Sequence, residues 1–189
     1  MVAASSATAR SSKKTVSGPS DRVEISEYDP TWAELFEQER DRLGGVFNSS
    51  AVSIEHIGST AVPGLCAKPI VDILVGLERL ELSDDQIAAM ERLDYEYLGE
   101  FGLPGRLYFR SSPTLYHVHV VQHGGEHWER QLVFRDALRS DPEERRRYDE
   151  LKRRLAAEGH SRNVYTELKT PLIREVEARA RARGVAPTS

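Results

Sequence analysis

Residues 56–77, HIGSTAVPGLCAKPIVDILVGL, bring together residue types that can bind phosphate and a divalent metal ion. Gly58, Ser59 and Thr60 form a turn signal, and the backbone amides and hydroxyls of such a turn can hold phosphate oxygens. The alternative is a tight turn that needs glycine only for its backbone conformation. The chain contains no GxxxxGKS or GxxxxGKT segment, so a Walker-type nucleotide loop is excluded.

Asp72 interrupts an otherwise apolar run, IVDILVGL, at residues 70–77. An unpaired buried carboxylate is unfavourable, so this side chain is expected to be paired or to face a cleft. One interpretation is a buried ion pair with a basic side chain such as Lys68. The other is a carboxylate that leans towards the phosphate-binding turn and binds Mg²⁺, a hard ion that prefers oxygen ligands.

A second group of candidate residues lies in the sequence HVHVV, residues 117–121. His117 and His119 are two positions apart, so on a strand they share one face. Two imidazoles at this spacing can bind Zn²⁺ or another transition metal, or one of them can act as a general base. The alternative is one hydrogen-bonded core histidine and one partly exposed histidine. A metal site would need a third ligand, for which the candidates are His56, Asp72, His123 and His127.

The basic residues of the C-terminal half give further candidates for phosphate contacts. Arg135 and Lys152 could each reach a phosphate if their helices cover the open end of the sheet. The same segment, RDALRSDPEERRRYDELKRRL at residues 135–155, is equally typical of a pair of charged surface helices.

Composition sets the class of protein. The chain has 189 residues, a net charge of −4 and a pI of about 5.9, so no overall basic field attracts nucleic acid or anionic membrane. A single cysteine, Cys66, excludes an internal disulfide, and no apolar run approaches the roughly 18 residues of a membrane span. These features predict a cytoplasmic protein. Residues 1–21 lack a secretory apolar core and are expected to form a disordered tail.

Periodicity and turn signals predict the elements that position these residues. We expect strands near residues 23–25, 51–57, 69–77, 96–98, 107–110 and 116–122. We expect helices from residue 30 to Gly44-Gly45, from 83 to 93, and over 126–139, 142–158 and 163–183. This order predicts an α+β domain with one mixed sheet, flanking helices and a helical C-terminal part.

The same segments resemble the GrpB (UPF0157) family. The matching segments are EYDPTW, EHIGSTAVPGL with KPIVDI, HVHVV, FRDALRSDPEERRRYDELKRRLA and YTELKTPLI, in that order. The resemblance covers about residues 22–181, and it places a GrpB-like domain at 22–184 with a short C-terminal tail at 185–189. It implies a nucleotidyltransferase fold of the DNA polymerase β class.

In that superfamily, a Gly-Ser turn holds the triphosphate and a D-x-D pair binds two metal ions. Gly58 and Ser59 match the turn, and Asp72 matches the first acid. The position of the second acid holds Leu74, and a later strand that might supply a third acid carries His117 and His119 instead. The resemblance therefore implies Mg²⁺ or Mn²⁺ at Asp72 with the two histidines as additional ligands, and the missing acids leave three alternatives: a single metal ion, a softer metal ion, or nucleotide binding without polymerase-type transfer.

Three functions remain open on this basis. The first is an enzyme that uses ATP or another nucleoside triphosphate to transfer a nucleotidyl or adenylyl group to a small-molecule acceptor; an ATP-dependent ligase acting through an acyl-adenylate is a close variant. Its phosphate contacts would be Gly58, Ser59, Thr60, Lys68, Arg135 and Lys152, and its catalytic residues Asp72, His119, His117 and Lys68. The second is a non-catalytic nucleotide-binding or interaction module, because family members also occur fused to dephospho-CoA kinase. The third is a metal-dependent hydrolase centred on Asp72 and the two histidines.

Overall fold

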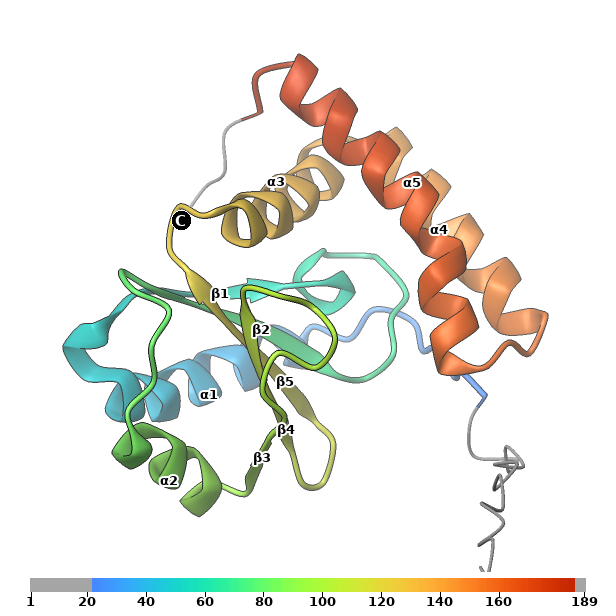
Figure 1. Cartoon of the computed structure of the whole chain (residues 1–189). Helices are drawn as coiled ribbons and strands as arrows, with labels where there is room; N and C mark the ends of the chain where they lie inside the picture. The colour runs from blue at the N-terminus through green and yellow to red at the C-terminus, as the bar shows by residue number, and fades with distance from the viewer. Residues whose placement is uncertain (1–21, 186–189) are drawn as a thin grey trace, which may run out of the picture.

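The computed structural model describes residues 22–185, which fold around one sheet (Figure 1). The elements, in chain order, are α1 (Thr31–Phe47), β1 (Ala51–Ile57), β2 (Val71–Leu77), α2 (Asp84–Arg92), β3 (Tyr95–Tyr97), β4 (Arg106–Ser111), β5 (Tyr116–Gln122), α3 (Glu126–Ser140), α4 (Pro142–Ala157) and α5 (Arg162–Ala182). Short 3₁₀ turns occupy Asn48–Ser50 and Ser59–Ala61. The predicted tails, residues 1–21 and all but Val185 of 185–189, lie outside the described residues.

The sheet has five strands in the order β1-β2-β5-β4-β3. β2 and β5 are parallel, and the other neighbouring pairs are antiparallel. This confirms the prediction of an α+β domain with a mixed sheet. The register pairs Ile57 of β1 with Asp72 of β2, and Asp72 in turn with His117 of β5. The candidate residues of three strands therefore meet side by side.

One face of the sheet carries the main apolar core. Ile73, Val75, Val118 and Val120 point to this side and are buried together with Phe109. Helices α1 and α2 cover this face and contribute Trp32, Phe36, Leu43, Phe47 and Met90 to the same cluster. Because alternate residues point to opposite faces, the residues at positions 72 and 74 of β2 project to the other side.

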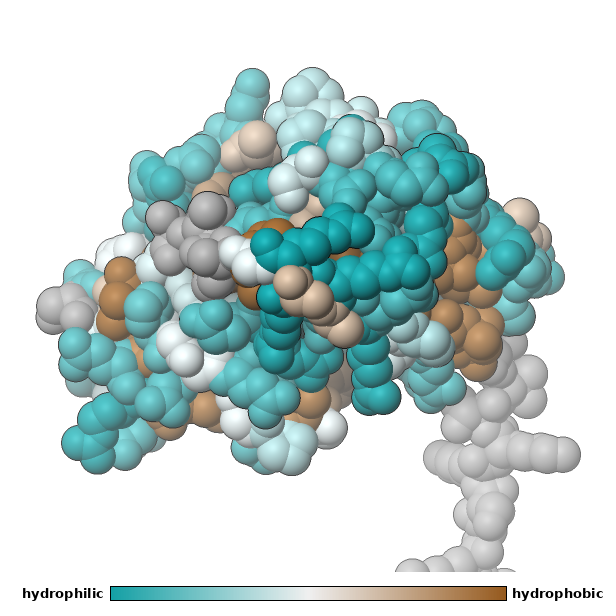
Figure 2. Space-filling model, turned by 90° about the horizontal axis from the view of Figure 1, so that it is seen from above, coloured by the Kyte–Doolittle hydropathy of each residue, from teal (hydrophilic) through white to brown (hydrophobic). Residues whose placement is uncertain are grey.

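The opposite face is covered by the C-terminal helices, which lie on the other side of the sheet from α1 and α2 (Figure 1). Leu74 packs there with Ile57, Val121, Trp128 and Leu132, so α3 covers β2 directly. Helices α4 and α5 pack against α3 and the bend at residues 62–65 through a separate apolar cluster. The surface over these helices is largely hydrophilic at its centre, and its hydrophobic residues form small separate patches (Figure 2).

The predicted elements are present, with two corrections. Helix α1 does not end at Gly44-Gly45 but continues to Phe47, which is buried in the core. Burial of this large ring outweighs the roughly 1 kcal/mol helix penalty of each glycine. The predicted strand near residues 23–25 is only an extended segment, held by isolated bridges of Arg22 with Ser161 and of Ser26 with Ala67. Within residues 22–185, no helix combines the length and apolar character needed to cross a membrane.

Candidate functional site

The turn at residues 58–60 and the carboxylate of Asp72 are in direct contact. Gly58 follows β1 with a φ of +71°, a conformation that side chains other than glycine rarely adopt. A Cβ atom placed on Gly58 would lie 2.5 Å from Oδ2 of Asp72. The glycine is therefore required both for the backbone turn and for the close approach of Asp72, and the turn and the acid belong to one site.

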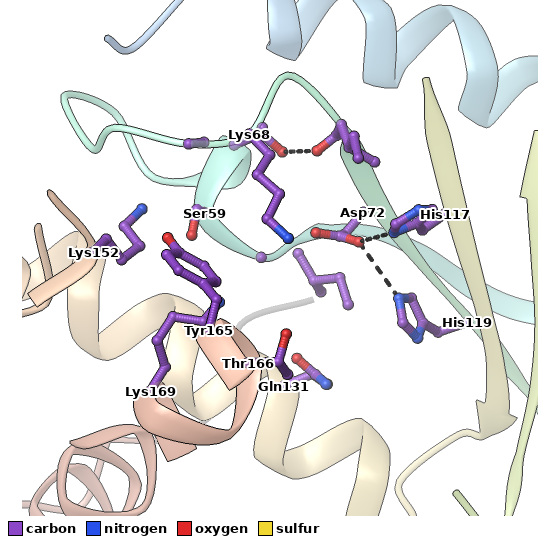
Figure 3. A pocket seen from close by; sticks show the side chains of 15 residues that line it. Ser59, Lys68, Asp72, His117, His119, Gln131, Lys152, Tyr165, Thr166 and Lys169 are labelled. Carbon is purple, nitrogen blue, oxygen red and sulfur yellow. Dashed lines mark hydrogen bonds and ion pairs between the residues drawn. The ribbon is translucent and has the colours of Figure 1, made fainter. Parts of the chain in front are cut away.

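Asp72 lies beside both histidines of β5 and accepts a hydrogen bond from His117. Its Oδ1 lies 3.2 Å from Nδ1 of His117 and 3.6 Å from Nε2 of His119, as the dashed lines in Figure 3 mark. Burial raises the pKa of Asp72, but the interactions with His117 and His119 outweigh it and hold the pKa well below its usual range. Burial lowers the pKa of His119. Asp72 is therefore an ionised carboxylate with two imidazoles fixed around one oxygen.

This cluster does not form a ready metal site. Among residues 22–185, no group of three histidine, cysteine, aspartate or glutamate side chains is placed to hold a metal ion. Asp72, His117 and His119 contact one another instead, so an ion would have to displace both contacts to Oδ1. Leu74, at the position of a second acid, is buried under Trp128 and Leu132. The residues present therefore do not fit a two-metal centre.

Opposite the acid and the histidines lie three lysines. Lys68 comes from the bend before β2, Lys152 from α4 and Lys169 from α5 (Figure 3). They are all the lysines of residues 22–185; the other side chains with a permanent positive charge in this range are arginines. Burial lowers the pKa of each to about 8, and Lys169 adds repulsion at Lys68 and Lys152. The three ammonium groups are poised to gain from a bound anion.

Aromatic rings and a carbonyl group hold the lysines in place. The ammonium groups of Lys68 and Lys169 lie 5.1 Å and 4.5 Å from the ring centroid of Tyr165, which is buried. Lys152 donates a hydrogen bond to the carbonyl of Cys66 and lies 5.1 Å from the ring of Tyr148. Cation–π contacts of this kind stabilise a charge without neutralising it. The charges therefore remain available to a ligand.

The two groups line one cavity of about 340 Å³. Of the predicted site residues, the structure places Gly58, Ser59, Thr60, Lys68, Asp72, His117, His119 and Lys152 on its wall. The wall also includes four side chains that the sequence did not single out as site residues: Gln131, Tyr165, Thr166 and Lys169. In Figure 3 Lys68 lies between Ser59 and Asp72, Lys152 lies beyond Ser59, Lys169 lies beside Tyr165, and the histidines lie on the far side of Asp72.

Arg135 is the predicted phosphate contact that the structure does not bring into the cavity. Its guanidinium is buried under α3, where it bonds Asp136 at 2.7 Å and Glu55 at 2.9 Å and donates to the carbonyl of His56. Burial lowers the pKa of Arg135, but the two carboxylates outweigh it and raise the pKa. The physical reason is the packing of α3 on β1, which places Glu55 opposite this arginine.

The remaining histidines considered as metal ligands have other partners. His56 stacks on Phe36 at a centroid distance of 4.8 Å and bonds Thr60. Burial lowers its pKa to about 4, so it is neutral and serves to hold the turn. His123 packs on Trp128, and Nε2 of His127 lies 2.8 Å from the carbonyl of Pro104. Asp72 is therefore the candidate third ligand that lies beside His117 and His119.

A known protein family matches the part of the chain that builds this site. The family model described as GrpB protein aligns with residues 22–179, which is nearly all of the described chain. The chain belongs to the GrpB family. The match includes the turn, both strands of the acid–histidine cluster and the helices that carry Lys152 and Lys169.

Individual relatives agree with this assignment. The chain is 38% identical over 166 residues to UPF0157 protein YqkA of Bacillus subtilis, with 86% of this chain and 48% of that protein aligned. The chain thus spans about half the length of that relative. A crystal structure of the conserved protein GrpB from Enterococcus faecalis matches with a TM-score of 0.77 and 41% identity, over 83% of this chain and 96% of that one. A more distant relative is named dephospho-CoA kinase, from Mycolicibacterium paratuberculosis, at 27% identity, with 80% of this chain and 44% of that protein aligned.

Proposed function

We propose that this GrpB domain binds the phosphates of a nucleoside triphosphate in the lysine-lined cavity and transfers the nucleotidyl group to a small-molecule acceptor. The observation that carries the proposal is the meeting of two opposite groups in one cavity. Three lysines and the Ser59 turn suit phosphate oxygens, and an ionised carboxylate with two imidazoles lies next to them. We propose a nucleotidyltransferase-like fold on the same grounds, with Asp72 at the position of the first acid.

Each group has a part in the proposed reaction. The lysines bind the β- and γ-phosphates and stabilise the charge of the departing pyrophosphate. The acceptor hydroxyl lies beside the histidines, and an imidazole oriented by Asp72 takes its proton as the new oxygen–phosphorus bond forms. The bond between the α-phosphorus and the bridging oxygen breaks, and pyrophosphate leaves. In this scheme Asp72 orients the base, as a carboxylate does in a His–Asp pair.

Magnesium or manganese enters this proposal with the substrate. A nucleoside triphosphate binds its cation through its own phosphates, so the protein needs only one oxygen ligand for the complex. Asp72 is the carboxylate on the cavity wall, and its Oδ2 offers that ligand while Oδ1 keeps its contacts with the histidines. A resident two-metal centre is not part of the proposal, because Leu74 is apolar and buried. Dialysis of the purified protein against a chelator followed by magnesium-free tripolyphosphate binding tests this point: binding should survive.

The test of turnover is the release of pyrophosphate from magnesium–ATP and other nucleotides in the presence of a panel of small hydroxyl and carboxylate acceptors. Wild-type protein should release pyrophosphate and form a nucleotide ester or anhydride, and Asp72→Ala should not, with unchanged unfolding. The carboxylate arm of the panel also detects an acyl-adenylate ligase. Absence of any product from the wild type across the panel would refute the transferase.

A second function is favoured by two observations. Leu74 fills the position of the second acid with a core residue, and a relative carries the name dephospho-CoA kinase. Both are compatible with a module that binds a nucleotide without turning it over. In that case wild-type protein would bind the nucleotide in the lysine-lined cavity, release no pyrophosphate, and lose binding in Lys169→Met.

A further inference from the structure

A row of aromatic rings continues outwards from the histidine side of the cavity. Tyr108 of β4 lies 5.1 Å from the ring of His119 and 5.5 Å from that of His117, measured between centroids. Phe101 stacks on Tyr108 at 5.4 Å, with an angle of 18° between the rings. His117 and His119 line the cavity, so the row of rings begins at the cavity wall and leads outwards from it.

Phe101 is held in an unfavourable position. Phe101 is 61% exposed to solvent, which is the highest value among the large hydrophobic residues of the described range, 22–185. Its backbone has a φ of +44°, in the left-handed region that aromatic residues rarely adopt. An exposed ring on a strained backbone costs stability, and such features concentrate at binding sites.

The loop around Phe101 is tied down. The amide of Gly105 donates to Oε1 of Glu100 at 2.8 Å, and Nη2 of Arg106 donates to the carbonyls of Glu100 and Phe101. The guanidinium of Arg106 also lies 4.7 Å from the centroid of Tyr108. These contacts fix the ring of Phe101 in the row, so the strain is maintained by specific bonds.

Nε of Arg106 adds a hydrogen-bonding group beside the rings. It is a buried donor without an acceptor among the described residues, whereas nearly all buried polar atoms in proteins are paired. A heteroaromatic ring carries acceptor atoms that suit such a donor. Aliphatic groups have neither the flat face for Phe101 nor the acceptor.

We propose that Phe101, backed by Tyr108, is the stacking subsite for the nucleobase of the bound nucleotide. The proposal rests on the proposed function, because it assigns the opposite end of the ligand whose phosphates lie on the lysines. Stacking on an aromatic face tolerates any base, so this subsite gives affinity for nucleotides over inorganic polyphosphate. Phe101 is then a specificity-determining residue.

The experiment compares ligands that contain the two ends separately. Inorganic tripolyphosphate carries phosphates without a ring, adenosine carries a ring without phosphates, and ATP carries both. In calorimetric titrations, Phe101→Ala should weaken ATP binding roughly tenfold or more and leave tripolyphosphate binding unchanged. Phe101→Trp should retain ATP binding. Leu103→Ala, at a neighbouring exposed position, is the matched control and should behave like the wild type.

Adenosine, which has no phosphates, tests the proposed subsite without any contribution from the lysines. In NMR titrations it should shift the ring signals of His117 and His119 in the wild type and not in Phe101→Ala. Urea unfolding of the variant should match the wild type, because the ring is exposed. Equal ATP affinity in Phe101→Ala and wild type, or adenosine shifts that persist in the variant, would overturn the subsite. Loss of tripolyphosphate binding in the wild type, with the adenosine shifts intact, would refute the phosphate site alone.

Discussion

The two walls of the cavity are built in different ways. The acid–histidine wall lies on neighbouring strands, where the backbone register fixes Asp72 beside His117 and beside the Gly58 turn. The lysine wall is assembled from a bend and two helices, so it depends on tertiary packing and on the ring of Tyr165. In the proposed reaction, the proton transfer that needs tight geometry therefore falls to the rigid sheet, and charge stabilisation, which tolerates looser placement, falls to the helices.

The largest expected effect is a change at Asp72 that lowers turnover without weakening anion binding, which would separate the roles of the two walls. Asp72→Asn should lower turnover by about a thousandfold, because the amide no longer orients an imidazole as the carboxylate does. The same change should tighten tripolyphosphate binding several-fold in mildly acidic buffer, because it removes a negative charge from the cavity. Pyrophosphate release and calorimetry measure the two effects. Asp85→Asn on α2 is the control, and a parallel loss of turnover and binding would contradict the division of roles.

The next effect tests the lysine wall. Lys169→Met should weaken tripolyphosphate binding by roughly 10- to 100-fold, since a charge-assisted hydrogen bond contributes about 1.5–3 kcal/mol. Arg174→Met, which removes an exposed cation from the same helix, should change affinity little. Calorimetry at low and moderate salt gives both values. Equal losses in the two variants would mean that only the general charge of α5 matters.

Raising the pH should have a smaller effect: it should weaken anion binding and increase the free energy of unfolding. With lysine pKa values of about 8, raising the pH from about 7 to about 9 removes protons from Lys68, Lys152 and Lys169 and should weaken anion binding several-fold. In the unfolded chain the same lysines hold their protons to about pH 10.4. The unfolded state therefore binds more protons above pH 8, so this group raises the free energy of unfolding as the pH rises.

Denaturant unfolding of the ligand-free protein and tripolyphosphate titrations, both across this pH range, measure the two trends. A triple variant with methionine at positions 68, 152 and 169 is the control, and its stability should lose this rise with pH. Binding that stays constant up to about pH 9 would contradict the assignment of the lysines to the anion.

The smallest effect concerns the cost of holding the lysines together. Lys169→Met should increase the free energy of unfolding of the ligand-free protein by about 1 kcal/mol at neutral pH, because it removes a partly buried charge repelled by Lys68 and Lys152. Urea unfolding measures this change, with Arg174→Met as the control. A destabilised variant would mean that its contact with Tyr165 contributes more than the repulsion costs.

The sequence predicted one wall better than the other for a physical reason. Asp72, His117 and His119 lie on strands, and Gly58 directly follows one, so local alternation and turn signals predicted these elements and the family resemblance implied that they meet. Lys169 and Tyr165 reach the cavity only because α5 docks over the bend, which no local pattern specifies. A signal for the lysines was nevertheless present: in residues 22–185 lysine occurs at positions 68, 152 and 169, while the charged surfaces use arginine.

Arg135 is a residue that the sequence wrongly placed in the site. Its position on a helix next to the sheet made it a reasonable phosphate contact, but charge pattern alone does not show which face of the helix meets which strand. Glu55 on β1 and Asp136 on α3 bind it instead. The aromatic row at Phe101 was also beyond the pattern, because its loop owes its shape to contacts from Glu100 and Arg106.

Lys152 and the carbonyl of Cys66 join the two walls. Through this bond α4 holds the bend that leads into β2, and α5, the last helix within residues 22–185, then contributes Lys169 and Tyr165. During synthesis the strands with Asp72 and the histidines emerge long before these residues. In the proposed site, a chain cut before α5 would keep Asp72, both histidines, Lys68 and Lys152 but would lose Lys169 and Tyr165, so weaker phosphate binding would distinguish it from a chain that contains α5.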